Sequence, residues 1–358
     1  MATAPVRRSF QTLDGLRAVG ALIIVMRHVP LFGPLRVPES FLAVDLFYLV
    51  SGFVVAHAYA QRLAAGGYFW DFVKVRLIRL YPFYLAGLAA GVLMATASIL
   101  QSPHSTWTLA KVAECVGLGL LMIPRFPGLA INGTTLDGPL WTLLYELVAN
   151  FVYAAAIKLM RAWVLAAIMI VSGVGVIWAE LSFKTLDVGY NLTDQWAALA
   201  RVGYSFFAGV LIYRLFGRGE QKAQWASLAC VAVLGVGLAC HLSRALIAPY
   251  EIGMVLVGMP VLVIAAARFE PGPMIGRTFS WIGLMSYGIY CLHQPLGNLA
   301  VMEIGRYVPR GLPGALVGVL FTVAVVLLCW VLDLYYDAPL RRWLRARLFP
   351  ARPRRASA

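Results

Sequence analysis

Charged residues are scarce in this chain. Asp, Glu, Lys and Arg together make up only 13% of its 358 residues, about half of the share that is usual in soluble proteins. Hydrophobic residues make up 61%, against about 45–50% in soluble proteins. A soluble protein of this length cannot bury so much apolar surface, so a soluble globular fold is excluded. The composition predicts a chain whose main solvent is lipid.

Acidic residues are scarcer than basic ones. There are 16 acidic and 30 basic residues, and the formal net charge is +14. The basic residues gather in clusters such as 62–79, 214–222 and the C-terminal tail. Lys and Arg collect in this way in the cytoplasmic loops of membrane proteins. The charge therefore indicates membrane orientation, and we expect no nucleic-acid partner.

Cysteine motifs, cleavage signals and repeats are also missing. The five cysteines lie in apolar runs without a CxxC pair or a metal-ligand spacing, so we expect small core residues, no disulfide and no metal site. The polar N-terminus is not followed by an A-x-A-like site after the first apolar run, so no cleavable signal peptide is expected. The sequence shows no strand pattern and no internal repeat.

Apolar runs of about 20 residues, each long enough to cross a bilayer, recur along the whole chain. If ten of them cross and the shorter run 108–123 does not, all basic clusters share one side and the acidic loop 180–194 faces the other. We therefore predict an all-α polytopic membrane protein with about ten transmembrane helices and both termini cytoplasmic. The ten runs are 15–33, 41–60, 81–100, 139–158, 162–180, 196–216, 225–243, 249–267, 279–301 and 313–334.

The remaining segments complete this topology. Run 108–123 is predicted to form a re-entrant or interfacial helix on the outer side, and the loop 124–138 that follows it is expected on the same side. Residues 1–345 are predicted to form a single transmembrane domain. Residues 346–358 are predicted to form a basic cytoplasmic tail that is solvated or lies on the lipid surface.

Three ionisable residues fall at similar depths within these runs. His28 lies eleven residues, or about 16 Å, along a helix from Arg17. Glu146 enters the membrane from the outer side and His293 rises from the inner side, so both reach the depth of His28 in a core of about 30 Å. Ionisable groups inside spans are usually functional, so we expect these three to converge on one cavity. For His293 alone, a bond to a backbone carbonyl is an equally good interpretation.

Other polar or small residues accompany this set. Arg27 points about 100° away from His28 around the helix, and it either pairs with Asp45 or lines the same cavity. Asp45 is interpreted as a structural residue that pairs with an arginine and holds the first two helices in register. Ser51 and Gly52 are small, which favours close helix packing.

Two arginines, Arg76 and Arg79, lie three residues apart and share one face of a helix. The pair either anchors the inner membrane surface under the positive-inside rule or clamps phosphates, which arginine binds in bidentate fashion. The sequence leaves both interpretations open.

Five stretches occur in a fixed order along the chain: Arg17 with His28, VDLFYLVSGF, RLIRLYP, WTLLYE and SYGIYCLH. Together they resemble the acyltransferase-3 family of integral membrane acyltransferases, over roughly residues 10–345. Thr142 stands where the pattern of this family has serine, and it keeps the hydroxyl. The soluble esterase-like domain that some members of the family carry is not seen after the membrane part.

The resemblance implies a multi-pass O-acyltransferase of the bacterial inner membrane. Such an enzyme moves an acyl group, most often acetyl, from cytoplasmic acyl-CoA to a hydroxyl of a cell-surface or secreted polysaccharide or its precursor. The implied partners are acyl-CoA, a carbohydrate acceptor and the lipid bilayer, and a homo-oligomer is left open. The alternative is a transporter or flippase of a lipid-linked glycan, which needs no acyl-CoA; a purely structural or regulatory membrane protein is a third class.

The resemblance also suggests roles for single residues. Arg17, Arg76 and Arg79 would hold the phosphates of the donor acetyl-CoA, with no metal involved. His28 would activate the acceptor hydroxyl as a general base or carry the acyl group itself, and Glu146 would set its tautomer or charge. The candidate donors to the oxyanion of the transition state are Tyr287, Trp141, Thr142 and Arg27.

Overall fold

The computed structural model describes residues 9–123, 136–191, 193–217, 219–240, 242–308 and 311–349. The predicted outer loop 124–138 lies outside the described residues except for its last three, and the predicted tail 346–358 does so except for its first four. Nearly all described residues are helical, as predicted. One departure is a pair of two-residue parallel strands, β1 (Gln221–Lys222) and β2 (Phe269–Glu270), which the sequence pattern did not indicate because two residues carry no readable period.

The chain divides into two compact units that do not follow chain order. Unit 1 contains Met1–Arg27, Leu35–Tyr59 and Leu159–Ser286, and unit 2 contains His28–Pro34, Ala60–Lys158 and Tyr287–Ala358. Three helices contribute residues to both units: α1 (Gln11–His28), α2 (Ala43–Ala64) and α11 (Pro273–Ile304). The single transmembrane domain over 1–345 stays a prediction.

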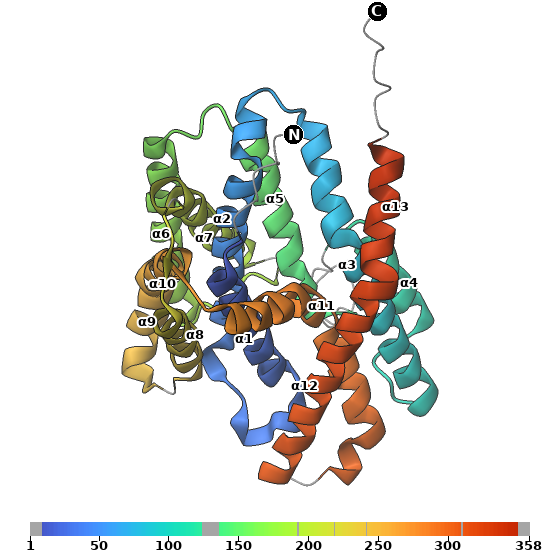
Figure 1. Ribbon diagram of the computed structural model, residues 1–358. Coiled ribbons are helices and arrows are strands. Elements are labelled where there is room, and N and C mark those ends of the chain that lie inside the picture. Colours follow the sequence, from blue (N-terminus) through green and yellow to red (C-terminus); the bar gives the residue numbers. More distant parts are fainter. Residues whose placement is uncertain are drawn as a thin grey trace, which may run out of the picture. The chain divides into compact units, whose positions relative to one another are not determined.

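Unit 1 is built mainly from five consecutive helices besides its parts of the shared helices. Helix α6 packs along α7, and α10 packs against both α7 and α8 (Figure 1). A π-helical turn at Met254–Gly258 joins α9 to α10, so that the two form one long span. The five helices are α6 (Ala162–Phe183), α7 (Gln195–Phe216), α8 (Gln224–Ala239), α9 (Arg244–Gly253) and α10 (Met259–Arg268).

Unit 2 is organised around the long helix α3, which packs against α4, α5 and α13. A second π-helical turn, Asp333–Asp337, joins α12 to α13, and the two run on as one rod (orange to red in Figure 1). Short 3₁₀ turns at Pro30–Leu35, Gly138–Leu140 and Gly305–Tyr307 lead into or out of helices. The helices of this unit are α3 (Phe69–Gln101), α4 (Leu109–Leu120), α5 (Trp141–Ala155), α12 (Leu312–Leu332) and α13 (Ala338–Leu348).

Six helical segments among the described residues are long and apolar enough to cross a membrane. They agree with six of the ten predicted runs, and the other four runs fall on α1, α5, α8 and α11. Helices α5 and α8 contain only 15 and 16 residues, fewer than the roughly 20 that a span needs, so the count of ten stays a prediction. The six segments are Glu39–Ala64, Phe69–Gln101, Ala162–Phe183, Gln195–Phe216, Ala245–Arg268 and Leu312–Leu348.

Helix α4 lies within the short run 108–123 that the sequence sets apart. Its 12 residues span about 18 Å, less than the hydrocarbon core. Val112 and Cys115 on its buried face pack into a core with Leu88, Met94 and Trp107. The apolar face of α4 is therefore used for packing against its own unit, in agreement with a helix that does not cross the membrane alone.

Close backbone contact joins α2 to α7 within unit 1. A Cβ placed on Gly52 would collide with the carbonyl oxygen of Phe206, and one placed on Gly209 would collide with the carbonyl oxygen of Leu49. The prediction that small residues in VDLFYLVSGF serve helix packing is confirmed for Gly52. Ser51, the other member of the pair, is partly buried beside it.

Replacing Gly52 with alanine should destabilise the protein by about 1–3 kcal/mol, because backbone atoms cannot move aside for the new methyl group. Thermal unfolding in detergent measures the change. The matched control is Gly235→Ala on α8, where the nearest atom to an added Cβ is 3.9 Å away and alanine is the better helix former. Equal unfolding midpoints for the two variants would contradict the packing assignment.

Candidate active site

Two histidines that are distant in sequence meet in unit 2. His28 is the last residue of α1, and its Nδ1 lies 3.1 Å from Nε2 of His293 on α11. His293 is fully buried, and its Nδ1 lies 3.0 Å from the carbonyl oxygen of Ile289 and 2.9 Å from that of Tyr290. The structure thus brings together two of the three residues that the sequence places at one depth. The predicted bond of His293 to a backbone carbonyl is confirmed, whereas the cavity shared with His28 and Glu146 stays a prediction.

These contacts determine which nitrogen of each imidazole carries hydrogen. Carbonyl oxygens only accept hydrogen bonds, so Nδ1 of His293 is the protonated nitrogen. A fully buried ring is far cheaper to keep neutral than charged, and Nε2 of His293 is therefore an acceptor. Nδ1 of His28 must then donate to it, which leaves the lone pair of His28 on Nε2. That nitrogen has the electronic state that a general base requires.

The turn before α5 is fastened to α11 beside the histidine pair. The backbone N–H of Gly138 donates to Oε1 of Gln294 at 2.7 Å, and the hydroxyl of Tyr290 donates to the carbonyl of Pro139 at 2.8 Å. The Thr142 hydroxyl lies 2.7 Å from that of Tyr290 and 3.0 Å from the same carbonyl. The start of α5 is therefore held in a fixed place along α11.

Arg76 of α3 and Glu146 of α5 form an ion pair, with Nη2 and Oε1 2.9 Å apart. Their side chains are only 6% and 15% exposed. Burial therefore leaves a phosphate from the solvent little access to Arg76. Arg79, one turn further along α3, is exposed, so the two arginines that were predicted to share one face differ in access.

Hydroxyls proposed as oxyanion donors are engaged elsewhere in this structure. The hydroxyl of Tyr287 donates to the carbonyl of Leu80 at 2.7 Å, and that of Thr142 contacts the carbonyl of Pro139. Trp141 is the first residue of α5, and its ring packs edge-on against Tyr145 with centroids 5.6 Å apart. The oxyanion roles therefore stay predictions.

The Acyl_transf_3 acyltransferase domain matches residues 10–334. The chain belongs to this family of membrane acyltransferases. Its match contains both histidines of the pair and all five stretches that carry the resemblance.

Two relatives of the acyltransferase are similar to it over different lengths. Protein 2 in the picA locus of Rhizobium radiobacter is 41% identical over 169 residues, which cover 43% of this chain and 85% of that protein. Nodulation protein 10 of Rhizobium leguminosarum bv. viciae is 26% identical over 271 residues, which cover 70% of each chain. No solved structure matches the acyltransferase.

The other predicted site residues of the acyltransferase lie in unit 1. Arg27 forms an ion pair with Asp187, and its guanidinium lies over the ring of Phe41, 5.1 Å from the centroid. Arg17 lies 3.6 Å from the carboxylate of Asp14 on the same helix, and its side chain is 20% exposed. The roles of both arginines stay predictions.

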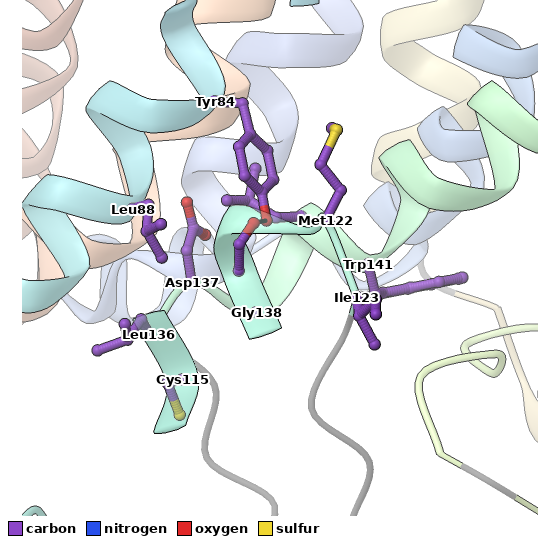
Figure 2. Close-up of a pocket in the computed structure, with 11 residues that line it drawn as sticks. Tyr84, Leu88, Cys115, Met122, Ile123, Leu136, Asp137, Gly138 and Trp141 are labelled. Carbon is purple, nitrogen blue, oxygen red and sulfur yellow. Dashed lines mark hydrogen bonds between the residues drawn. The ribbon is translucent and has the colours of Figure 1, made fainter. Parts of the chain in front are cut away.

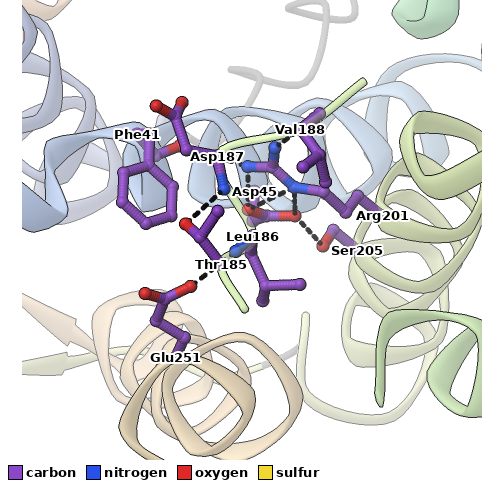
Figure 3. A network of polar contacts seen from close by, with 9 residues as sticks. All are labelled: Phe41, Asp45, Thr185, Leu186, Asp187, Val188, Arg201, Ser205 and Glu251. Carbon is purple, nitrogen blue, oxygen red and sulfur yellow. Dashed lines mark hydrogen bonds and ion pairs between the residues drawn. The ribbon is translucent and has the colours of Figure 1, made fainter. Parts of the chain in front are cut away.

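Asp45 pairs with an arginine, as the sequence indicates, but with one on a different helix (Figure 3). Arg201 of α7 binds it through Nη2 at 2.6 Å and through Nε at 3.2 Å, and both side chains are at most 2% exposed. The same guanidinium donates to the carbonyls of Val188 at 3.0 Å and Phe41 at 3.2 Å. The pair therefore joins α2 to α7 instead of setting the register of the first two helices. Arg201 is the better partner because its guanidinium reaches both carboxylate oxygens of Asp45 and two backbone carbonyls at once.

Three residues that make these contacts in the two units were not singled out in the sequence. Arg201 is an ionisable residue in a predicted span, a signal that usually marks function or structure, and Tyr290 precedes His293 by three residues and so shares its helix face. Asp187 lies in the predicted outer loop 180–194, where an acidic residue carries no such signal.

Arg76→Gln and Glu146→Gln should each lower stability by about 3–5 kcal/mol, because either change leaves the other charge buried without its partner. The double variant should lose less stability than the sum of the losses in the two single variants. Unfolding midpoints of the four proteins give the coupling. The matched control pairs Glu146→Gln with Lys74→Gln, an exposed position on α3, where additive losses are expected. Additive losses for Arg76 and Glu146 would contradict the ion pair.

Arg201→Lys should also destabilise the acyltransferase by about 3 kcal/mol, because one ammonium group cannot reproduce the planar set of donors that reaches Asp45 and two carbonyls. Thermal unfolding checks this. Arg62→Lys on α2 is the control, since Arg62 is exposed and its change should be nearly neutral. An Arg201→Lys variant with the same unfolding midpoint as the wild type would overturn the assignment.

Proposed function

We propose that the acyltransferase moves an acetyl group, or another acyl group, from cytoplasmic acyl-CoA to a hydroxyl of a cell-surface or secreted polysaccharide or its precursor. The observation that carries this proposal is the contact between His28 and His293, which leaves the basic nitrogen on Nε2 of His28. The enzyme would act in a bacterial inner membrane with both termini in the cytoplasm.

In this reaction, Nε2 of His28 takes the proton of the acceptor hydroxyl as its oxygen attacks the thioester carbonyl. A new C–O bond forms, the C–S bond breaks, and the proton passes from His28 to the sulfur of the departing CoA. His293 accepts a hydrogen bond from Nδ1 of His28 and stabilises the imidazolium that forms transiently. A route through an acyl group on Nε2 of His28 starts from the same nitrogen.

The backbone carbonyls of Ile289 and Tyr290 have an indirect part in this mechanism. They hold the hydrogen of His293 on Nδ1, and this keeps its Nε2 ready to accept from His28. His293 is thus a positioning residue that acts through His28. Its full burial keeps water from competing for the contact.

Arg79 would be one of the residues that bind the phosphates of the acyl-CoA donor. This residue is exposed at the end of α3 that carries the basic cluster, and a guanidinium binds phosphate oxygens well. Arg76 is paired with Glu146, which supports a role in fixing α3 to α5 ahead of a role on the donor. Arg17 would also help to bind the phosphates of the donor.

The carbohydrate acceptor is supported by the family alone. The names of the two relatives, a nodulation protein and a protein of the picA locus, specify neither substrate nor acyl group. The histidine pair supports transfer to a hydroxyl, and it does not specify which molecule carries that hydroxyl.

His28→Ala should lower the rate of CoA release from radiolabelled acetyl-CoA by about 10²–10⁴-fold, the usual contribution of a general base. His293→Ala should lower kcat while leaving the KM for acetyl-CoA near the wild-type value, because it acts on His28. Purified protein in nanodiscs is used for both. Full activity of His28→Ala in folded protein would refute the proposed mechanism.

Arg79→Ala should raise the KM for acetyl-CoA about tenfold or more, the loss expected for one charge-assisted hydrogen bond. Arg62→Ala removes another exposed arginine of the same cluster and serves as the control for net charge. An equal rise of the KM in the two variants would show that Arg79 acts only through the net charge of the cluster and does not bind the donor.

A further inference from the structure

A cavity of about 40 Å³ lies in unit 2 between α3, α4 and the start of α5 (Figure 2). Tyr84 and Leu88 line it from α3, Gly119 lines it from α4, and Asp137 and Trp141 line it from the start of α5. A water-sized group needs roughly 10–15 Å³ measured in this way. The cavity therefore has room for about three such groups, and not for a whole sugar ring.

Asp137 is the unusual member of this lining. It is 6% exposed, and both of its carboxyl oxygens are buried without a hydrogen-bond partner among the residues that the structure describes. Buried polar groups in native proteins are nearly always hydrogen-bonded, so each exception calls for an explanation.

The backbone around Asp137 is held in place on both sides. Gly138 donates to Gln294 at 2.7 Å, and a Cβ on Gly91 would come within 2.6 Å of the carbonyl oxygen of Leu136. A Cβ on Gly87 would lie 3.2 Å from Oδ2 of Asp137 itself. The missing Cβ of Gly87 thus leaves room for the carboxyl, and that of Gly91 leaves room for the backbone beside it.

The burial of Asp137 suits a neutral ligand. Asp137 precedes the predicted span 139–158, and burial raises the pKa of its carboxyl well above the usual range. A carboxyl buried with no partner in the described part of the chain favours its uncharged form, which offers one O–H donor and acceptor oxygens. Such a group pairs well with an alcohol, which also donates one hydrogen bond and accepts others.

The remaining walls provide apolar surface and one more polar atom. The Tyr84 hydroxyl donates to the carbonyl of Gly119 at 2.7 Å, so its oxygen is still able to accept. The side chains of Leu88 and Trp141 supply apolar surface (Figure 2). Apolar walls with a few convergent polar groups are typical of small-molecule sites.

We propose that this cavity is a subsite for one hydroxyl-bearing carbon of a neutral polyhydroxylated acceptor, with Asp137 as the residue that hydrogen-bonds the hydroxyl. The proposal rests on the proposed function and names the part of the acceptor site that the cavity supplies. Its place supports this role, because the turn that carries Asp137 is fastened to Gln294, the residue next to His293.

The test is infrared difference spectroscopy of the full-length protein in nanodiscs, with methyl β-D-glucopyranoside as the probe. The glucoside should shift the C=O stretch of a protonated carboxylic acid, and Asp137→Asn should remove the shifted band. The fully O-methylated glucoside has the same ring without a hydroxyl, and it should cause no shift. Glu180→Gln alters a buried carboxyl of unit 1 that does not line the cavity, and this variant should keep the glucoside-induced shift.

The outcomes separate this subsite from the proposed function. No shift in the wild type, a shift that persists in Asp137→Asn, or an equal shift with the O-methylated glucoside would each overturn the subsite. The readout needs neither acetyl-CoA nor turnover. Failure of CoA release would therefore count against acyl transfer, while the infrared result would still decide whether Asp137 binds a hydroxyl.

Discussion

An unpaired charge buried in an apolar interior is strongly destabilising, and this constraint governs how the polar residues of the acyltransferase are arranged. Arg76 is paired with Glu146, and Arg201 with Asp45. In each case the partner is supplied by a segment far away in the sequence. The ion pairs therefore act as fixed points between helices, where apolar side chains alone would permit sliding.

The histidine pair obeys the same constraint without a charge. Two backbone carbonyls take up the hydrogen of His293, and His293 takes up that of His28. These contacts leave the basic lone pair of His28 on its Nε2. A neutral pair of this kind is cheap to bury, and in the proposed reaction it would gain a proton only transiently, while the neighbouring imidazole stabilises the charge.

Asp137 stands apart from these satisfied groups. Its carboxyl is buried without a partner in the described part of the chain, yet the backbone on both sides is firmly packed. Proteins tend to keep local departures from good packing or pairing at functional sites, where the surrounding structure enforces them. The departure here lies in the turn that leads into α5, and α5 carries Glu146 as well.

The sequence by itself determined the helical membrane class and the family, and it singled out both members of the histidine pair. Composition and apolar runs depend only on local residue types, and His28 and His293 stand out because ionisable groups are rare in such runs. The tertiary structure decided which residues pair. Arg201 took Asp45, Arg76 took Glu146, and the cavity at Asp137 arose where two glycines of α3 meet the turn before α5. Helical periodicity shows which face a residue occupies, but it cannot show which distant helix will lie opposite, because that depends on how all the helices pack together.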